Sequence, residues 1–211
     1  EEMEDLVNDE IFEIKNHNNN FATGLKEIDL DKMKKGVYND KIKVIDSKNI
    51  NNLSISSSTK SQIDHSKSKY FPPVGDQGNK NSCVSWSMAY YIQSFYEARA
   101  HDWDLSKLEF NDDTLNGDKT KVMSPDFVYH LINGGGNRGT YPPDALEIIK
   151  HIGTASWDKM SYDSDEFSRW PKELAWREAA KYRGKNLEDD DISLYYLKID
   201  SIEDIDLIKD L

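Results

Sequence analysis

The chain contains a single cysteine, Cys83, among 211 residues. No intrachain disulfide is therefore possible, and the fold has to be held by noncovalent contacts. Hydrophobic residues make up 37% of the sequence, which is enough for one domain of moderate size plus an extension. Cys83 follows a polar, glycine-containing loop, residues 76–82, and precedes an apolar stretch. A cysteine at such a junction is a candidate nucleophile.

The stretch that begins at Cys83 has the spacing of a helix. Its apolar residues recur at helical intervals, and they are Val84, Met88, Tyr91, Ile92, Phe95 and Tyr96. Cys83 would lie in the first turn, where the positive end of the helix favours a thiolate. Gln77, upstream in the same loop, could donate its side-chain amide to an oxyanion, with the Cys83 backbone N–H as second donor. These groups suit acyl transfer; the alternative is that Cys83 is a small buried apolar residue.

Residues 72–83 read Pro-Pro-Val-Gly-Asp-Gln-Gly-Asn-Lys-Asn-Ser-Cys and resemble the active-site segment of papain-like cysteine peptidases. Further segments resemble prokaryotic members of that family in the same order, namely 123–129, 134–146, 178–183 and 194–197. Pro125 after Ser124 is a start signal for one of the helices expected there, and Gly153 just past residues 144–151 is a stop signal for another. The resemblance implies an α+β, papain-like fold, with the helical left domain and the start of the β-rich right domain. It also implies a cysteine endopeptidase that uses Cys83 as nucleophile and Gln77 in the oxyanion hole, without a metal or organic cofactor.

Several positions depart from the family pattern. Lys80 stands where relatives have a disulfide cysteine, Asn81 replaces a glycine, and Val84 replaces the tryptophan after the nucleophile. The departures at Asn81 and Val84, together with Arg138 in place of a glycine, motivate an alternative function, a catalytically inactive papain-like binding or surface-assembly module. Retention of both Gln77 and Cys83 favours the enzyme.

The glycine-rich segment 134–140 resembles the loop that lines the substrate groove. Arg138 occupies the first position of the family's Gly-Gly pair, which leaves Gly139 as the expected partner of the substrate backbone. Together with Thr140, these residues are the predicted substrate-binding positions.

A papain-like site also needs a histidine base and an orienting asparagine, roughly 130–150 residues after the cysteine. Counted from Cys83, that position lies beyond Leu211. The histidines present are expected to be structural or solvated, and they are His17, His65, His101, His130 and His151. We therefore expect a C-terminal chain or segment to supply the histidine and asparagine. A helical pattern over residues 202–211 without a stop signal agrees with a chain that continues.

The first 66 residues differ in composition from the rest. They contain an amphipathic helix pattern at 3–12, a strand pattern at 42–45 and, from residue 47, a stretch rich in Ser, Asn and Lys. We interpret 1–66 as the propeptide-like extension and linker of a zymogen. Residues 67–211 would be the N-terminal portion of the peptidase domain. The alternative for 1–66 is a structural extension.

The net charge of −12 argues against nucleic acid and anionic membrane partners, so protein or peptide substrates are expected. No apolar run approaches the roughly 18 residues of a transmembrane helix, and no membrane span is predicted. The family resemblance favours a secreted or cell-surface protein. Asp112, Asp113 and Asp118 lack the spacing of a calcium loop, and we expect 97–122 to be irregular and solvated.

Overall fold

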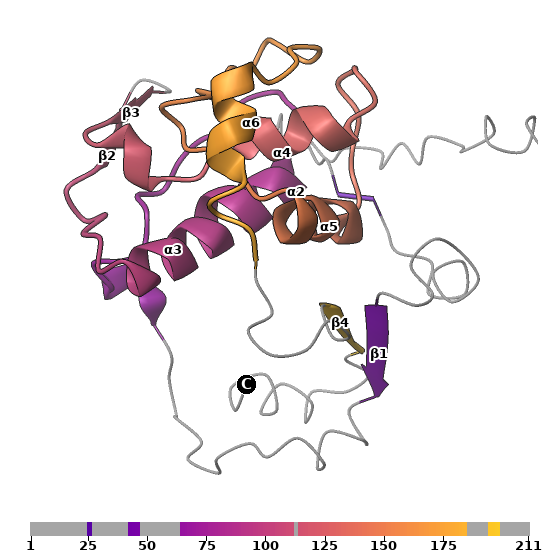
Figure 1. The fold of residues 1–211 in the computed structure, drawn as a ribbon, viewed down its shortest axis with the longest axis horizontal. Coiled ribbons are helices and arrows are strands. Elements are labelled where there is room, and N and C mark those ends of the chain that lie inside the picture. Colours follow the sequence, from indigo (N-terminus) through magenta and orange to yellow (C-terminus); the bar gives the residue numbers. More distant parts are fainter. Residues whose placement is uncertain (1–24, 27–41, 47–63, 112–113, 185–193, 199–211) are drawn as a thin grey trace, which may run out of the picture.

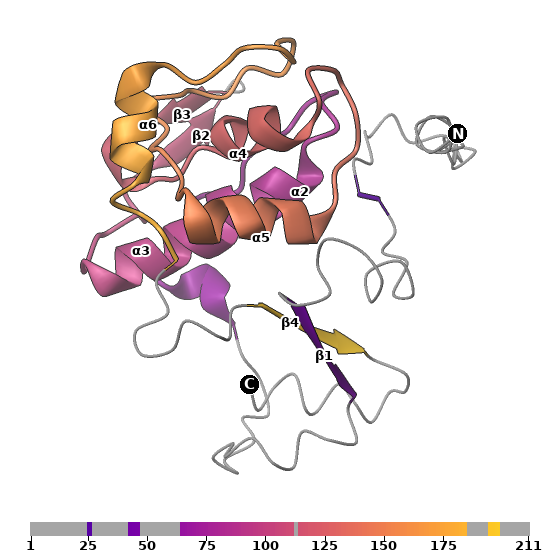
Figure 2. The same cartoon turned by 45° about the vertical axis from the view of Figure 1, so that its right-hand side comes forward.

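The computed structural model describes residues 25–26, 42–46, 64–111, 114–184 and 194–198. Figures 1 and 2 show a body of helices that carries a small antiparallel strand pair, with a separate parallel strand pair below it. Mixed helices and strands agree with the predicted α+β class. The helices predicted at residues 3–12 and 202–211 lie outside the described residues.

The central helical stretch begins at Cys83 and changes its hydrogen bonding twice. It consists of α2 (Cys83–Ser85), the π-helix η3 (Trp86–Gln93) and α3 (Ser94–Ala100). The predicted helix is confirmed, but its predicted apolar face is wrong, since Ile92 is 43% and Tyr96 61% exposed. The buried residues of η3 are Trp86, Ala89, Tyr90 and Gln93. A π-helix bonds residue i to i+5, so a face projected with 3.6 residues per turn falls out of phase.

Three shorter helices surround this stretch. They are α4 (Pro125–Ile132), α5 (Pro142–His151) and α6 (Glu173–Ala179). The predicted start signal of α4 is confirmed, because Ser124 Oγ accepts a hydrogen bond from the Phe127 N–H at 3.1 Å. The predicted stop signal after α5 is also confirmed. Gly153 has a φ of 92°, and a Cβ there would lie 1.9 Å from the carbonyl oxygen of Ala179, so only glycine fits.

Two apolar clusters share the central stretch. The first gathers side chains of α2, η3, α4, α5 and α6, and its buried members are Val84, Ala89, Phe127, Val128, Ala145, Ala155, Met160, Ala175 and Ala179. The second is rich in aromatic rings and consists of Trp86, Tyr90, Ala98, Leu105, Leu108, Leu115, Val122 and Trp157. Both clusters therefore hold the helix that begins at Cys83.

The segment 97–122, which we expected to be irregular, is ordered in its described residues. It holds the end of α3, the antiparallel strands β2 (Glu109–Asn111) and β3 (Thr114–Asn116), and the 3₁₀ helix η4 (Lys119–Lys121). Most described residues of the segment are exposed, as expected, but the expected lack of regular structure was wrong because the many acidic residues obscured three leucines. Leu105 and Leu115 are fully buried and Leu108 is nearly so, and they anchor the segment to the second cluster.

The strand predicted at residues 42–45 is confirmed as β1 (Ile42–Asp46). It pairs in parallel with β4 (Leu194–Lys198), with Ile42 opposite Leu194. The boundary predicted between residues 66 and 67 thus separates two paired strands, and it also falls within the 3₁₀ helix η2 (His65–Lys67). The predicted extension is joined to the later part of the chain by a strand ladder.

Candidate active site

Gln77 and Cys83 line the same pocket, which has a volume of about 370 Å³. The other lining residues are Gly75, Asp76, Gly78, Trp86, Ser87 and Tyr91. Cys83 is half-buried and is the first residue of α2. The structure thus brings together the two side chains that the sequence named as nucleophile and oxyanion donor.

At the start of α2, the side chain of the N-cap residue does not cap the helix. Ser82 is the N-cap residue, yet its hydroxyl makes no capping bond and instead lies 2.7 Å from the hydroxyl of Tyr162. The first helical bond runs from the Trp86 N–H to the Ser82 carbonyl oxygen at 3.0 Å. The Ser82 side chain therefore does not occupy the N–H groups at the positive end of the helix, beside Cys83.

The Gln77 side chain is held by the loop in which it lies. Gln77 Nε2 donates to the backbone carbonyl oxygen of Lys80 at 2.9 Å, and the backbone carbonyl oxygen of Gln77 accepts from the Tyr162 hydroxyl at 2.7 Å. An amide NH₂ carries two hydrogens in one plane, so the bond to Lys80 fixes the direction of both. The orientation of the Gln77 amide is therefore fixed within the loop.

Two consecutive tyrosines of η3 fix the segment upstream of Gln77. The Tyr90 hydroxyl donates to the Pro73 carbonyl oxygen at 2.8 Å, and the Tyr91 hydroxyl accepts from the Gly75 N–H at 3.1 Å. Gly75 lies so close to η3 that a Cβ would come within 2.4 Å of the Trp86 ring. We call residues 73–82 the nucleophile loop.

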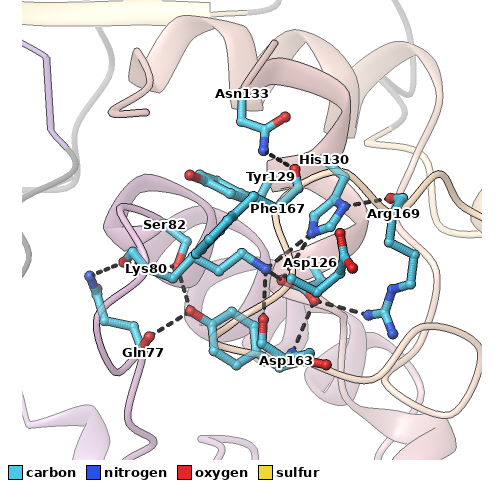
Figure 3. A network of polar contacts seen from close by, with 12 residues as sticks. Gln77, Lys80, Ser82, Asp126, Tyr129, His130, Asn133, Asp163, Phe167 and Arg169 are labelled. Atoms are coloured by element: carbon cyan, nitrogen blue, oxygen red, sulfur yellow. Dashed lines mark hydrogen bonds and ion pairs between the residues drawn. The ribbon is translucent and has the colours of Figure 1, made fainter. Parts of the chain in front are cut away.

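Sequence reasoning missed the buried charge beneath this loop. Lys80 is completely buried, and its Nζ donates to Asp126 Oδ1 at 2.5 Å, to the Asp163 carbonyl oxygen at 2.9 Å and to His130 Nε2 at 3.0 Å (Figure 3). Asp126 Oδ2 also accepts from Arg169 Nη2 at 3.0 Å. The signal in the sequence was the spacing of Asp126 and His130, which puts both on one face of α4.

Burial shifts the titration of this cluster. It raises the pKa of Asp126 to about 6, against the opposing pull of Lys80 and Arg169. Burial, followed by the charge of Lys80, lowers the pKa of His130 to about 4. Burial also lowers the pKa of Lys80, and the charge of Asp126 opposes that shift. At pH 7 His130 is therefore neutral, with Nδ1 bonded to the Arg169 carbonyl oxygen at 2.5 Å and Nε2 turned to Lys80.

Among the described residues, no histidine lines the pocket. His65 packs against the Phe95 ring, and His101 packs against Trp103. His151 lies at the end of α5, 3.3 Å from Glu147, and His130 belongs to the buried cluster. These four histidines are structural or surface residues, as predicted, whereas His17 lies outside the described residues.

The predicted substrate-binding residues lie in a second loop, residues 133–140, which we call the glycine-rich loop. Asn81 of the nucleophile loop joins the two, because its N–H donates to Asn137 Oδ1 at 2.8 Å and its Nδ2 donates to the Asn137 carbonyl oxygen at 3.2 Å. Arg138 is exposed, Gly139 is half-buried and Thr140 is buried. The bonds to Asn137 thus hold the predicted substrate-binding residues next to the loop that carries Gln77.

The backbone of Thr140 pairs with the N-terminal extension. The Lys26 N–H donates to the Thr140 carbonyl oxygen at 3.1 Å, and Leu25 forms a parallel bridge with Thr140. Leu25 itself is 61% exposed. Residues 25–26 therefore pair with the edge of the glycine-rich loop.

Comparisons with known proteins add little to this geometry. No family model matches the chain, and no curated protein matches it. One similar solved structure is xylellain, a cysteine protease from Xylella fastidiosa, with 18% identity and a TM-score of 0.46. The match covers 67% of this chain and 50% of that one, so this chain spans about half the length of that structure. A likeness of this degree assigns neither a family nor an activity.

Two further observations concern only the described segments. Their helices all fall short of the length and apolar character that crossing a bilayer requires. Their His, Cys, Asp and Glu side chains form no group of three that could hold a metal ion.

Proposed function

We propose that the chain is the N-terminal portion of a papain-like cysteine endopeptidase, with Cys83 as nucleophile. The observation that carries this proposal is that Cys83, at the start of α2, shares its pocket with Gln77. The amide of Gln77 is fixed by the Lys80 carbonyl oxygen at 2.9 Å. A merely buried cysteine needs neither an open pocket nor an oriented amide donor beside it.

The chemistry follows from these groups. The Cys83 thiolate attacks the scissile carbonyl carbon, and the electron pair of the C=O bond moves onto oxygen. The Cys83 N–H and Gln77 Nε2 stabilise that oxyanion. Collapse of the intermediate expels the amine, which takes a proton from a histidinium, and water then hydrolyses the thioester. Sequence beyond residue 211 would supply this histidine and its orienting asparagine, because the described histidines lie elsewhere.

The glycine-rich loop would bind the substrate backbone through Arg138, Gly139 and Thr140. Support comes from the pairing of the Lys26 N–H with the Thr140 carbonyl oxygen, since the same edge already accepts a backbone hydrogen bond from residues 25–26. A substrate strand and residues 25–26 would compete for this edge. We therefore propose that residues 1–66 restrain the enzyme as a propeptide would.

The test uses the full-length protein that contains this chain, with a fluorogenic peptide as substrate. Wild type should cleave the peptide, and Cys83→Ala should abolish cleavage. Iodoacetamide should alkylate Cys83 faster at pH 6–7 than it alkylates a cysteine in an unstructured peptide, because the helix start and the histidine favour the thiolate. Absence of Cys83-dependent cleavage, with ordinary alkylation rates, would instead support the inactive binding module.

A second test concerns the separate contributions of residues 1–66 and of the segment that follows Leu211. The 211-residue chain alone should be inactive, and addition of the segment that follows Leu211 should restore cleavage, because a thiolate without a general base cannot complete the reaction. Removal of residues 1–66 should raise the activity of the restored enzyme. Equal activity with and without residues 1–66 would contradict the propeptide role.

A further inference from the structure

The ammonium of Lys80 is fully satisfied by groups from other parts of the chain. An ammonium has three hydrogens, and here they meet three acceptors: Asp126 Oδ1 at 2.5 Å, the Asp163 carbonyl oxygen at 2.9 Å and His130 Nε2 at 3.0 Å. Two of these come from α4 and the third from the loop before α6. Since each hydrogen bond points in a different direction, the Nζ position is fixed in space rather than merely attracted to a charge.

Aromatic rings close the remaining sides of this site. Lys80 Nζ lies 5.1 Å from the ring centroid of Tyr129 and 4.9 Å from that of Tyr162, both within cation–π range. The Lys80 side chain is completely buried, as is that of Asp126. A buried ammonium with so many partners is unlike a surface ion pair, whose two long side chains keep much of their freedom.

The acceptors are themselves held in place. Asp126 Oδ2 accepts from the Asp163 N–H at 3.1 Å and from Arg169 Nη2 at 3.0 Å. Arg169 in turn accepts from His130 Nδ1 through its backbone carbonyl oxygen at 2.5 Å. These bonds connect α4 with residues 163–169 and do not involve Lys80.

The other end of Lys80 supports the candidate oxyanion donor. Its backbone carbonyl oxygen accepts from Gln77 Nε2 at 2.9 Å and from the Ser82 N–H at 2.8 Å. Figure 3 shows both ends of the residue, with the ammonium in the buried cluster and the carbonyl oxygen beside Gln77. Lys80 thus connects the buried cluster with the Gln77 amide and with Ser82, the residue before Cys83.

We propose that Lys80 is a positioning residue whose anchored ammonium holds its own carbonyl oxygen, and through it the amide of Gln77, in the orientation that stabilises the oxyanion. This inference rests on the proposed function. Lys80 occupies the position at which the family resemblance expects a disulfide cysteine, and the ionic anchor provides a noncovalent constraint on the same loop. Displacement of a catalytic group by about 1 Å can cost on the order of 10²-fold in rate.

The test is a double-mutant cycle in the full-length enzyme. Lys80→Met should lower kcat on the order of tenfold or more and change KM by no more than about twofold, because the oxyanion exists only in the transition state. In a Gln77→Ala background, Lys80→Met should cost at most about twofold further in kcat, since the group it positions is gone. Lys159→Met is the matched control, because Lys159 makes an equally short 2.5 Å bond to Asp158 on the surface; its kcat should equal that of wild type.

The outcomes separate this inference from the function on which it rests. If Gln77→Ala lowers kcat and Lys80→Met does not, or if the two losses multiply fully, the positioning role is overturned. If Gln77→Ala itself retains full kcat, the proposed oxyanion role fails first. Should Lys80→Met not fold, Asp126→Asn replaces it in the cycle with the same expectations, since it keeps the side-chain size and removes the charge that anchors Lys80.

Discussion

The nucleophile loop and the glycine-rich loop border the candidate site in different ways. The nucleophile loop is held by its own buried Lys80, which bonds to Asp126, and by the hydroxyls of Tyr90 and Tyr162 from other segments. The glycine-rich loop is largely exposed, and its contacts run through Asn137 and the hydroxyl of Tyr129. Both loops depend on α4, which carries Asp126, Tyr129 and His130.

This difference matches what each loop would have to do. A transition-state donor has to be preorganised, because reorganisation during the reaction raises the barrier. A loop that pairs with substrate backbone has to accept different side chains and to release the product. Gly134 and Gly135, with φ values of 65° and 80°, give the glycine-rich loop backbone conformations that other residues rarely adopt.

The largest expected effect comes from removing the anchor of the nucleophile loop. Asp126→Ala leaves the buried Lys80 ammonium without its carboxylate, and we expect it to lower the free energy of unfolding by about 3–5 kcal/mol. Asp158→Ala breaks the surface pair with Lys159 and should cost less than about 1 kcal/mol. Urea unfolding of the chain measures both. Equal, small losses would show that the buried cluster does not hold the loop.

The second effect is the pH dependence of the free energy of unfolding. The ionic cluster that anchors the nucleophile loop should contribute to it. The folded-state pKa of His130 is about 4, below the ordinary value of about 6.5, so its contribution to stability is full above pH 6.5 and is lost as the pH falls towards 4. Asp126 has a raised pKa of about 6, and its contribution has the opposite sign, being full below about pH 4 and lost as the pH rises through 6. In the wild type, the contributions of His130 and Asp126 to the free energy of unfolding therefore change in opposite directions as the pH changes.

His130→Phe removes the pH-dependent contribution of His130 to the free energy of unfolding. Relative to wild type, the variant should gain on the order of 2 kcal/mol of stability as the pH falls from 6.5 to 4, whatever its loss at neutral pH. Asn137→Ala, in the glycine-rich loop, removes no titratable group, so its difference from wild type should be the same at every pH. Urea unfolding at several pH values between 4 and 7 gives both curves. Parallel curves for His130→Phe and wild type would contradict the pKa assignment.

The third effect compares one glycine in each loop. Gly75→Ala should cost about 2–3 kcal/mol, because the new methyl group would overlap the Trp86 ring. At Gly135 a Cβ would meet nothing within 4 Å, so Gly135→Ala should cost only the backbone strain of positive φ, about 1 kcal/mol. Thermal unfolding distinguishes the two. A larger cost at Gly135 would mean that the glycine-rich loop is the tighter of the two.

The sequence predicted the elements whose signals are local. The helix at Cys83, the Ser124 cap of α4, the stop at Gly153 and the strand at residues 42–45 all depend on neighbouring residues, and the structure confirms them. Cys83 and Gln77 were predicted to lie close together, and they line one pocket. Their catalytic roles stay predictions.

The features that the sequence could not show depend on distant contacts. Lys80 and Asp126 are separated by 46 positions, so the sequence did not reveal their ion pair. It showed Lys80 only as a residue at the position where relatives have a disulfide cysteine. The π-helix displaced the predicted apolar face because a single sequence carries no signal for a change in hydrogen-bond period. The hairpin β2–β3 was missed because its burial rests on a few leucines among acidic residues.

The most direct test of the account is the kinetic effect of Gln77→Ala in the full-length protein, with Gln93→Ala as control. Gln93 also donates its side-chain amide to a backbone carbonyl oxygen, that of Tyr182 at 2.6 Å, but it lies away from the pocket lining. We expect Gln77→Ala to lower kcat on the order of 10²-fold or more with little change in KM, and Gln93→Ala to leave kcat near the wild-type value. A Gln77→Ala enzyme with wild-type kcat would show that Gln77 only shapes the loop, and the proposed oxyanion site would be wrong.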